Sequence, residues 1–331
     1  MNEARNHHYL PQCYLRGFRP GGRKPKLTVL DLNKGRHFRT SPRNVGGIRD
    51  FNRIEVDGLP PDALEKNLSG FEGQVAKALN DLQTTRSLDD KITFAVIMNL
   101  IALVAVRNPQ TRHQWSDFQS EVHKKMLGLT LATEERWKST ARRMKEDGID
   151  IDENVTFAQM REFYERDEYN IVTNREHHIT IELEGINTVL PFLFNRNWTL
   201  LIASDDAGPF VTSDRPVALT WKHPENVPPI FRESPGFGMQ DTRIVFPVGQ
   251  DMTLIGEFNN YDNCTAFVER KTVAVVNSQI ILFAISQVYA PHLNFNWLDS
   301  QGELKDGRAL LSYVRSMREK AAQSEAQYEK A

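Results

Sequence analysis

The middle of the chain carries apolar residues at the spacing of an α-helix. Six of them are separated by 4, 3, 4, 4 and 3 positions and share one helical stripe: Leu64, Leu68, Phe71, Val75, Leu79 and Leu82. A second helix is predicted to start near Asp89-Asp90, whose carboxylates suit a helix N-terminus, and to end at Arg107-Asn108-Pro109. Because residues 92–106 of this helix are apolar almost all round, we expect them to be buried.

Further helices are predicted from amphipathic patterns at residues 111–127, 133–146 and 157–166. Another helix is marked by five apolar residues at helical spacing: Ile179, Leu183, Ile186, Leu190 and Leu193. Pro191 is expected to bend or stop it. The section from residue 59 to 196 is therefore expected to be helical.

Short β-type runs lie on both sides of this helical section. Before it, residues 26–32 and 37–40 predict a hairpin, and residues 53–56 predict a further strand. After Trp198 six runs resemble strands: WTLLIAS, FVTS, PVALTW, RIVFPV, MTLIGEF and TVAVVN. Helices are expected again over residues 277–289 and after Gly307.

This segregation predicts an α+β fold with a largely helical middle section and short, mainly antiparallel strands in the N-terminal and C-terminal parts. We expect one domain over residues 1–331. Its sub-regions are an irregular, β-containing segment (1–58), a helical region (59–196) and a β-rich region with C-terminal helices (197–331).

Composition narrows the class of protein. The 331 residues are 40% hydrophobic and 25% charged, which is typical of a globular protein. The formal net charge is -2, so the chain as a whole has no positive field that would attract a polyanion. Two cysteines, Cys13 and Cys264, cannot build a disulfide framework, and no signal peptide is apparent. Residues 92–106 are shorter than a membrane span. We therefore expect a soluble cytoplasmic protein with no membrane partner, and the oligomeric state stays open.

The segment NHHYLPQCYLRGF near the N-terminus is the densest run of chemically versatile side chains. His7 and His8 are candidate catalytic residues, and either can equally cap a neighbouring element. In an extended segment adjacent rings point to opposite faces, so the pair is a poor chelate. Gln12 and Arg16 are candidate substrate-binding residues, since a guanidinium fork binds two oxygens of a phosphate or carboxylate.

Three carboxylates elsewhere complete the candidate site. Glu65 and Glu72 lie seven positions apart on one flank of the first helix, where they can join His8 as ligands of a divalent metal or simply face solvent. Asp214, within TSDRP, is a candidate catalytic carboxylate at a strand end, and turn chemistry explains it equally well. Arg215 beside it is a further candidate for substrate binding.

The chain resembles the domain of unknown function 4238 family, which occurs in bacteria and elsewhere. The resemblance is carried, in order, by HHYLPQCYLRGF (7–18), LEKNLSGFEGQVAKAL (64–79), FVTSDRPVAL (210–219), RIVFPVGQDMTLIG (243–256) and VNSQIILFAISQVYA (276–290). It implies a shared fold and a shared site, and it supplies no activity.

Two classes of function fit these residues. The first is a hydrolase of a phosphodiester or similar anionic substrate, with a metal-dependent nuclease as one form, in which histidine or a metal-bound water starts the attack and Arg16 with Arg215 stabilises phosphate charge. Its substrate would be nucleic acid or a nucleotide. The alternative is a non-catalytic ligand-binding or protein-interaction module, as in a sensor or defence protein. The first class requires the fold to bring His7 or His8 close to Glu65, Glu72 or Asp214.

Overall fold

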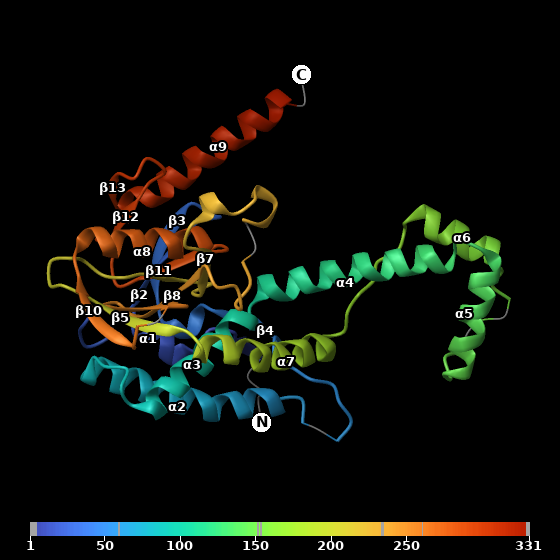
Figure 1. Ribbon diagram of the computed structural model, residues 1–331, viewed down its shortest axis with the longest axis horizontal. Coiled ribbons are helices and arrows are strands. Elements are labelled where there is room, and N and C mark those ends of the chain that lie inside the picture. Colours follow the sequence, from blue (N-terminus) through green and yellow to red (C-terminus); the bar gives the residue numbers. More distant parts are fainter. Residues whose placement is uncertain are drawn as a thin grey trace. The chain divides into compact units, whose positions relative to one another are not determined.

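The computed structural model describes residues 5–58, 60–150, 152, 154–232, 235–259 and 261–328. It divides into two compact units: residues up to Asn108 together with those from Ile179 onward, and the stretch Pro109–His178 between them. The first unit contains all the described strands, and the second is helical (Figure 1). The predicted α+β class is confirmed.

A five-stranded sheet forms the centre of the first unit, in the order β10-β5-β9-β8-β7. Its strands are β5 (Asn197–Ala203), β7 (Ala218–Trp221), β8 (Thr242–Gly249), β9 (Met252–Glu257) and β10 (Cys264–Val268). All neighbours are antiparallel except β10 and β5, which run parallel. In β5 every second residue is buried, so the two faces of the strand differ as period-two alternation requires.

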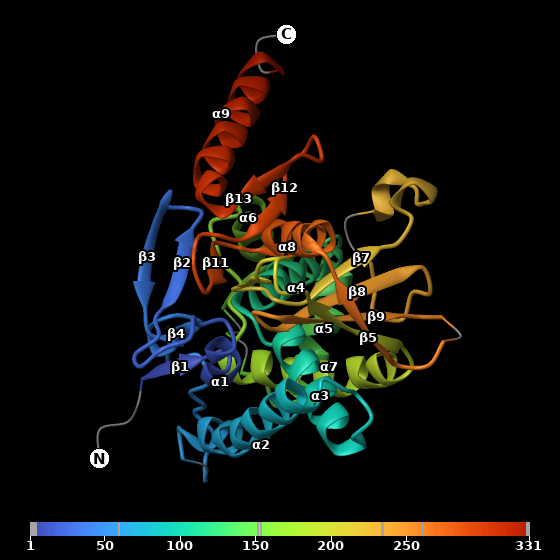
Figure 2. The same cartoon turned by 90° about the vertical axis from the view of Figure 1, so that its left-hand side faces the viewer.

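A second sheet joins distant parts of the sequence in the order β3-β2-β11-β6. Its strands are β2 (Leu27–Asp31), β3 (Arg36–Thr40), β6 (Thr212–Ser213) and β11 (Gln287–Ala290). Two small antiparallel pairs complete the described strands: β1 (Asn6–His8) with β4 (Gly47–Arg49), and β12 (Asn296–Leu298) with β13 (Leu304–Asp306). Figure 2 shows β1, β4 and the β2–β3 hairpin together on one side of the unit.

The helices of the first unit cover both faces of the central sheet. They are α1 (Gln12–Arg16), α2 (Ala63–Thr85), α3 (Lys91–Val106), α7 (Arg175–Phe194, from Ile179 onward), α8 (Arg270–Phe283) and α9 (Leu310–Tyr328). On β8, Ile244, Phe246 and Val248 join a core with α2, α3 and α7. Val245, pointing the other way, packs in a second core with α8. The sheet is thus the middle of three layers (Figure 1).

α1 holds the N-terminal segment against this sheet. Tyr14 is fully buried, stacks on Phe246 with ring centroids 5.2 Å apart, and donates to the carbonyl of Pro247 at 2.9 Å. Since that proton is committed to a carbonyl, the Thr212 hydroxyl is the donor in its 2.6 Å bond to the tyrosine oxygen. The segment that carries His7 and His8 is therefore anchored through Tyr14, which follows the histidines, to β8 and β6.

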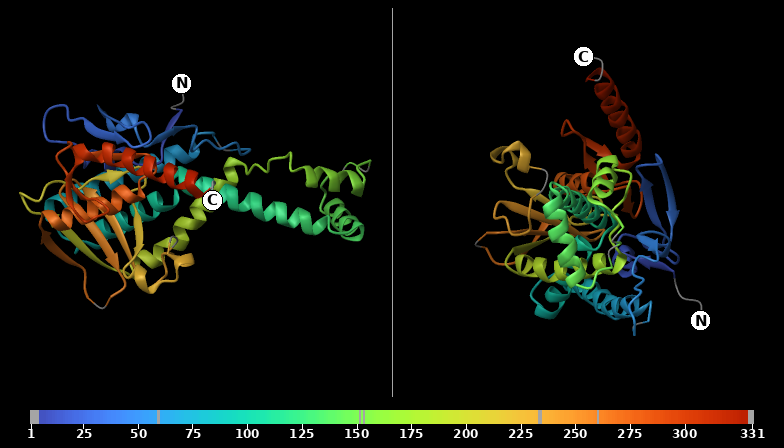
Figure 3. Two further views of the ribbon diagram at one scale, coloured as in Figure 1. Left: turned by 90° about the horizontal axis from the view of Figure 1, so that it is seen from above. Right: turned by 90° about the vertical axis from the view of Figure 1, so that its right-hand side faces the viewer.

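The second unit consists of α4 (Pro109–Thr130), α5 (Glu134–Glu146) and α6 (Phe157–Arg166). Thr133 and Thr156 cap the two shorter helices by accepting from the backbone N–H groups of Arg136 and Gln159. Gln159 completes a capping box. In the two views of Figure 3, α5 and α6 gather at the C-terminal end of α4.

Most predicted helices are found close to their predicted bounds, and α3 begins where Asp90 accepts from the Thr93 N–H at 2.8 Å. Three local predictions are wrong. Residues 53–56 form no strand, and the strand of that region is β4. The run TVAVVN lies in α8 and is not a strand, and residues 277–289 comprise the end of α8 followed by β11. Pro191 lies inside α7 without ending it.

The α8 error arises because valine by itself prefers strands. The buried residues of α8 are Val273, Ala274, Val276, Asn277 and Ile280, which follow helical and not alternating spacing. Packing against the sheet decides the conformation there. In the part of the chain that is described, no single helix is long and apolar enough to cross a membrane. Taken together, the consecutive helices α3 and α4 reach the necessary length and apolar content, but the pair is bent.

Candidate functional site

A buried polar network lies beneath the N-terminal histidines. Asn52 is fully buried at its centre, and its backbone N–H donates to Nδ1 of His7 at 2.8 Å. Its side-chain amide donates to Glu65, and its side-chain carbonyl accepts from Arg107. Arg107 also pairs with Glu182 at 3.6 Å, with both side chains almost entirely removed from solvent. The network ties β1, α2, the end of α3 and α7 together.

One largely enclosed cavity lies next to this network. It is lined by side chains from three distant segments: His8, Tyr9, Pro11, Glu65, Leu68, Glu72, Leu103 and Arg107. Its volume of about 10 Å³ is room for about one water molecule. The fold therefore brings His8, Glu65 and Glu72 together, as the candidate site required.

His8 is placed by β1. Pairing of β1 with β4 sets His7 opposite Ile48 and His8 opposite Gly47, and the two rings diverge: His7 is buried, whereas His8 is half-buried. Nε2 of His8 lies 3.1 Å from the carbonyl oxygen of Arg43. A carbonyl only accepts, so Nε2 carries the hydrogen and Nδ1 of the neutral ring keeps a lone pair. Burial lowers the pKa of His8, which favours this neutral form, although the Arg43 carbonyl and Glu65 oppose the shift.

Glu72 is shifted in the opposite direction. Burial raises the pKa of its carboxyl group, and the negative charge of Glu65 raises it further, against the opposing effects of Arg16 and Arg107. A neutral imidazole thus lies on the same cavity as a carboxyl group that retains its proton to higher pH. Environments that move two titratable groups in opposite directions are how acid and base roles are assigned in enzymes.

The α1 residues near the cavity differ in exposure and in charge. Arg16 is exposed, and its positive charge opposes the rise in the pKa of Glu72. Gln12 is half-buried in the first turn of α1. Burial raises the pKa of the Cys13 thiol to about 11, and Glu72 contributes to the rise. The thiol is therefore protonated at neutral pH and is a poor nucleophile.

Asp214 and Arg215 are placed differently. The buried carboxylate of Asp214 accepts from the N–H groups of Ile285, Ser286 and Gln287 and from the Ser286 hydroxyl, at 2.7 to 3.0 Å. These contacts fix the turn before β11. Burial raises the pKa of Asp214 and the four hydrogen bonds lower it. Arg215 lies over the Phe283 ring at 5.5 Å. Neither residue lines the cavity.

The predicted metal ligands share the cavity without forming a ligand cluster. Among the residues that the structure describes, no group of three or more histidine, cysteine, aspartate or glutamate side chains is arranged to hold a metal ion. Glu65 instead accepts from Asn52, and Nε2 of His8 is directed at a backbone carbonyl.

A family model described as "Protein of unknown function (DUF4238)" matches residues 6–292. The chain belongs to this family. Searches of curated proteins and of solved structures find no match. The matched span includes every residue of the cavity and of the Asn52 network. The resemblance read from the sequence is confirmed, and it assigns no activity.

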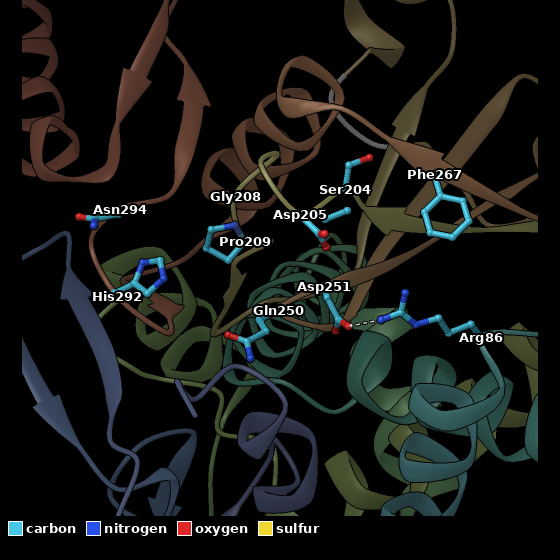
Figure 4. A pocket seen from close by; sticks show the side chains of 11 residues that line it. Arg86, Ser204, Asp205, Gly208, Pro209, Gln250, Asp251, Phe267, His292 and Asn294 are labelled. Atoms are coloured by element: carbon cyan, nitrogen blue, oxygen red, sulfur yellow. Dashed lines mark ion pairs between the residues drawn. The ribbon is translucent and has the colours of Figure 1, made fainter. Parts of the chain in front are cut away.

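This DUF4238 chain also has an open polar cleft, of about 640 Å³, remote in sequence from the histidine segment (Figure 4). Loops after β5 and β11, the β8–β9 turn and the end of α2 surround it. Asp251 accepts from Gln83 at 2.7 Å and pairs with Arg86 at 3.7 Å. Arg86 ends α2 in the left-handed region with φ of 50°, which is uncommon for arginine. His292 and Asn294 line the opposite side.

Sequence patterns do not mark Asn52, Arg107 or Glu182 as site residues. The local signal is that Arg107 and Asn108 follow directly on an almost wholly apolar helix, where an arginine near a core requires a partner. Nothing local marks Asn52, whose burial depends on β1, α2 and α3 meeting around it.

Proposed function

We propose that the protein is a hydrolase of phosphodiesters or similar anionic esters, with His8 as general base and Glu72 as general acid. The observation that carries the proposal is the meeting of His8, Glu65, Glu72 and Arg107 around one cavity. The opposite pKa shifts of His8 and Glu72 support the division of roles.

In the proposed reaction, Nδ1 of His8 removes a proton from water while the water oxygen attacks phosphorus. The bond from phosphorus to the leaving oxygen breaks, and the protonated Glu72 carboxyl supplies the proton that this oxygen needs. Arg16 stabilises negative charge on the phosphate oxygens. Transfer of a proton from His8 back to Glu72, through solvent, restores both groups.

The charge distribution of the chain supports an anionic substrate. Residues 1–58 contain 12 lysine and arginine residues against 5 aspartate and glutamate residues, a net charge of +7, whereas the whole chain carries -2. Exposed Arg16, Arg43 and Arg49 belong to this segment. A basic segment around the cavity attracts polyanions, so nucleic acid is the substrate class that we propose.

A metal-assisted form of the same reaction is a second version of the proposal. In it, a divalent ion held by His8 with Glu65 or Glu72 would supply an acidic water. The ligand side chains would have to leave the partners described above. Metal dependence of cleavage separates the two versions.

The test is cleavage of single-stranded DNA, single-stranded RNA and a chromogenic phosphodiester at mildly acidic and neutral pH, with chelator or with Mg²⁺ or Mn²⁺. We expect cleavage by the wild type and a loss of about 10² to 10⁴-fold in His8→Gln, which is the usual contribution of a general base.

The matched control is His37→Gln, which changes an exposed histidine on β3 outside the cavity. It should cleave like the wild type. Absence of cleavage by the wild type under every condition, or equal cleavage by His8→Gln, would overturn the proposed hydrolase.

The alternative function, non-catalytic ligand binding, is supported by the open cleft at Arg86 and Asp251. Its size suits a small molecule, and its side chains supply both hydrogen-bond donors and acceptors. A protein that cleaves nothing but is stabilised against heat by a nucleotide or another small anion, with that effect lost in Arg86→Gln, would favour this alternative.

A further inference from the structure

Helix α4 carries an apolar stripe on its exposed side. Its members are separated by 3, 4, 4 and 3 positions and are 36 to 64% exposed: Trp115, Phe118, Val122, Met126 and Leu129. No residue of α4 is buried. A helix in a globular protein normally turns such a stripe toward a core. Within the stripe, Trp115 packs edge-to-face on Phe118 with ring centroids 5.9 Å apart.

We propose that two copies of the chain associate through this stripe as an antiparallel pair of α4 helices centred on Val122. The spacing of the stripe reads the same in both directions, which is what a two-fold axis requires of one surface that meets itself. With the axis at Val122, Phe118 lies opposite the partner's Met126, and Trp115 lies opposite the partner's Leu129. Each large ring then faces a flexible aliphatic side chain.

The charges beside the stripe select the antiparallel direction. Glu121 in the first half of α4 and Lys125 in the second half are exposed and lie on the same flank of the stripe. An antiparallel pair brings Glu121 of one helix near Lys125 of the other, and it also opposes the helix dipoles. A parallel pair would bring like charges together. Asp117 and Lys124 lie on the far side of the helix, where they pair with His113 and Asp167.

The length of the stripe suits such a contact. From Trp115 to Leu129 it spans fourteen residue steps, about 21 Å at 1.5 Å per residue. α5 and α6 gather at the C-terminal end of α4 (Figure 3), and Gln119 in its first half bonds to Thr173 and His177 of the same unit at 2.9 and 2.8 Å. The five side chains of the stripe remain exposed. The inference is independent of the proposed hydrolase, since no residue of the cavity takes part.

The experiment is light scattering coupled to gel filtration, and sedimentation velocity, on the full chain over a range of concentrations. We expect the wild type to have twice the 38.0 kDa chain mass and Val122→Glu to have the mass of a single chain. The control is Val172→Glu, which makes the same change at an 84% exposed valine of the same unit and should leave the dimer intact. Circular dichroism verifies that both variants retain their helices.

A second measurement tests the direction of pairing. Under oxidation, a mixture of the Phe118→Cys and Met126→Cys variants should form a mixed disulfide, because an antiparallel pair places position 118 opposite the partner's position 126. A parallel pair would instead link Phe118→Cys to its own copy. The wild type, which has an exposed Cys264, is the control for other disulfides. A wild type that is monomeric at all concentrations, or a Val122→Glu variant that remains dimeric, overturns the proposal. A dimer that is lost in Val122→Glu, together with a Phe118→Cys variant that links to its own copy and not to Met126→Cys, overturns the antiparallel register.

Discussion

Two polar family segments, HHYLPQ near the N-terminus and TSDRP beginning at β6, differ in how far the hydrogen-bonding capacity of their side chains is filled. Asp214 in the second segment has four hydrogen-bond donors on its carboxylate. His8 in the first has one described hydrogen bond, made through Nε2, and it lines a cavity that Glu72 also lines. A side chain whose hydrogen-bonding capacity is filled holds the fold, whereas one with capacity left beside a cavity is available for chemistry.

Loss of the ion pair beneath the cavity should have the largest effect. Arg107→Met removes the Arg107 cation from the buried Glu182 carboxylate and the donor to Asn52, so we expect a loss of about 3 to 5 kcal/mol in the free energy of unfolding. Urea denaturation measures it. Arg86→Met is the matched comparison, since its pair with Asp251 is partly exposed and worth less than about 1 kcal/mol. Equal losses in the two variants would show that the network is not what holds the site.

Asp214→Asn should reduce the free energy of unfolding by less than Arg107→Met does. It should leave hydrolysis intact, which would show that the TSDRP segment holds the fold and takes no part in catalysis. The amide retains one acceptor oxygen but loses the charge, and it introduces donors that face the N–H groups of residues 285–287. We expect a loss of about 2 kcal/mol in the free energy of unfolding. Hydrolysis per folded molecule should stay within about twofold of the wild type. A large loss of rate in a folded Asp214→Asn protein would return this carboxylate to the catalytic site.

The sequence predicts the helices well because each is specified by local spacing, as in α2 and α3. It fails in α8, where valines with a strand preference are held in a helix by packing against the sheet. The candidate site divides in the same way. His8 is recognisable by residue type, and Glu65 and Glu72 are recognisable by residue type and by their position beside the apolar stripe of α2. Asn52 and Glu182 are not recognisable, because only contacts between distant segments bury them.

Glu72→Gln should have the smallest effect on the free energy of unfolding, and at neutral pH it should stabilise the protein. The pKa of Glu72 is raised in the folded state, so its charged form is penalised there, and this penalty appears as pH rises above the ordinary glutamate value. Glu72→Gln should therefore match the wild type near pH 4 and be more stable than it at neutral pH, as measured by urea denaturation at both values. A glutamine variant that is less stable at neutral pH would show that the Glu72 charge is accommodated without cost.

The dependence of kcat/KM on pH, for the wild type and Glu72→Gln, tests the acid and base assignment most directly. Activity needs His8 neutral and Glu72 protonated. Because burial lowers the first pKa from 6.5 and raises the second from 4.5, these forms coexist in mildly acidic solution. For the wild type we predict that kcat/KM is greatest in this range and falls toward neutral pH as Glu72 ionises. In Glu72→Gln, kcat/KM should be much lower and should no longer fall toward neutral pH. A variant that retains the rate and profile of the wild type would contradict the assignment.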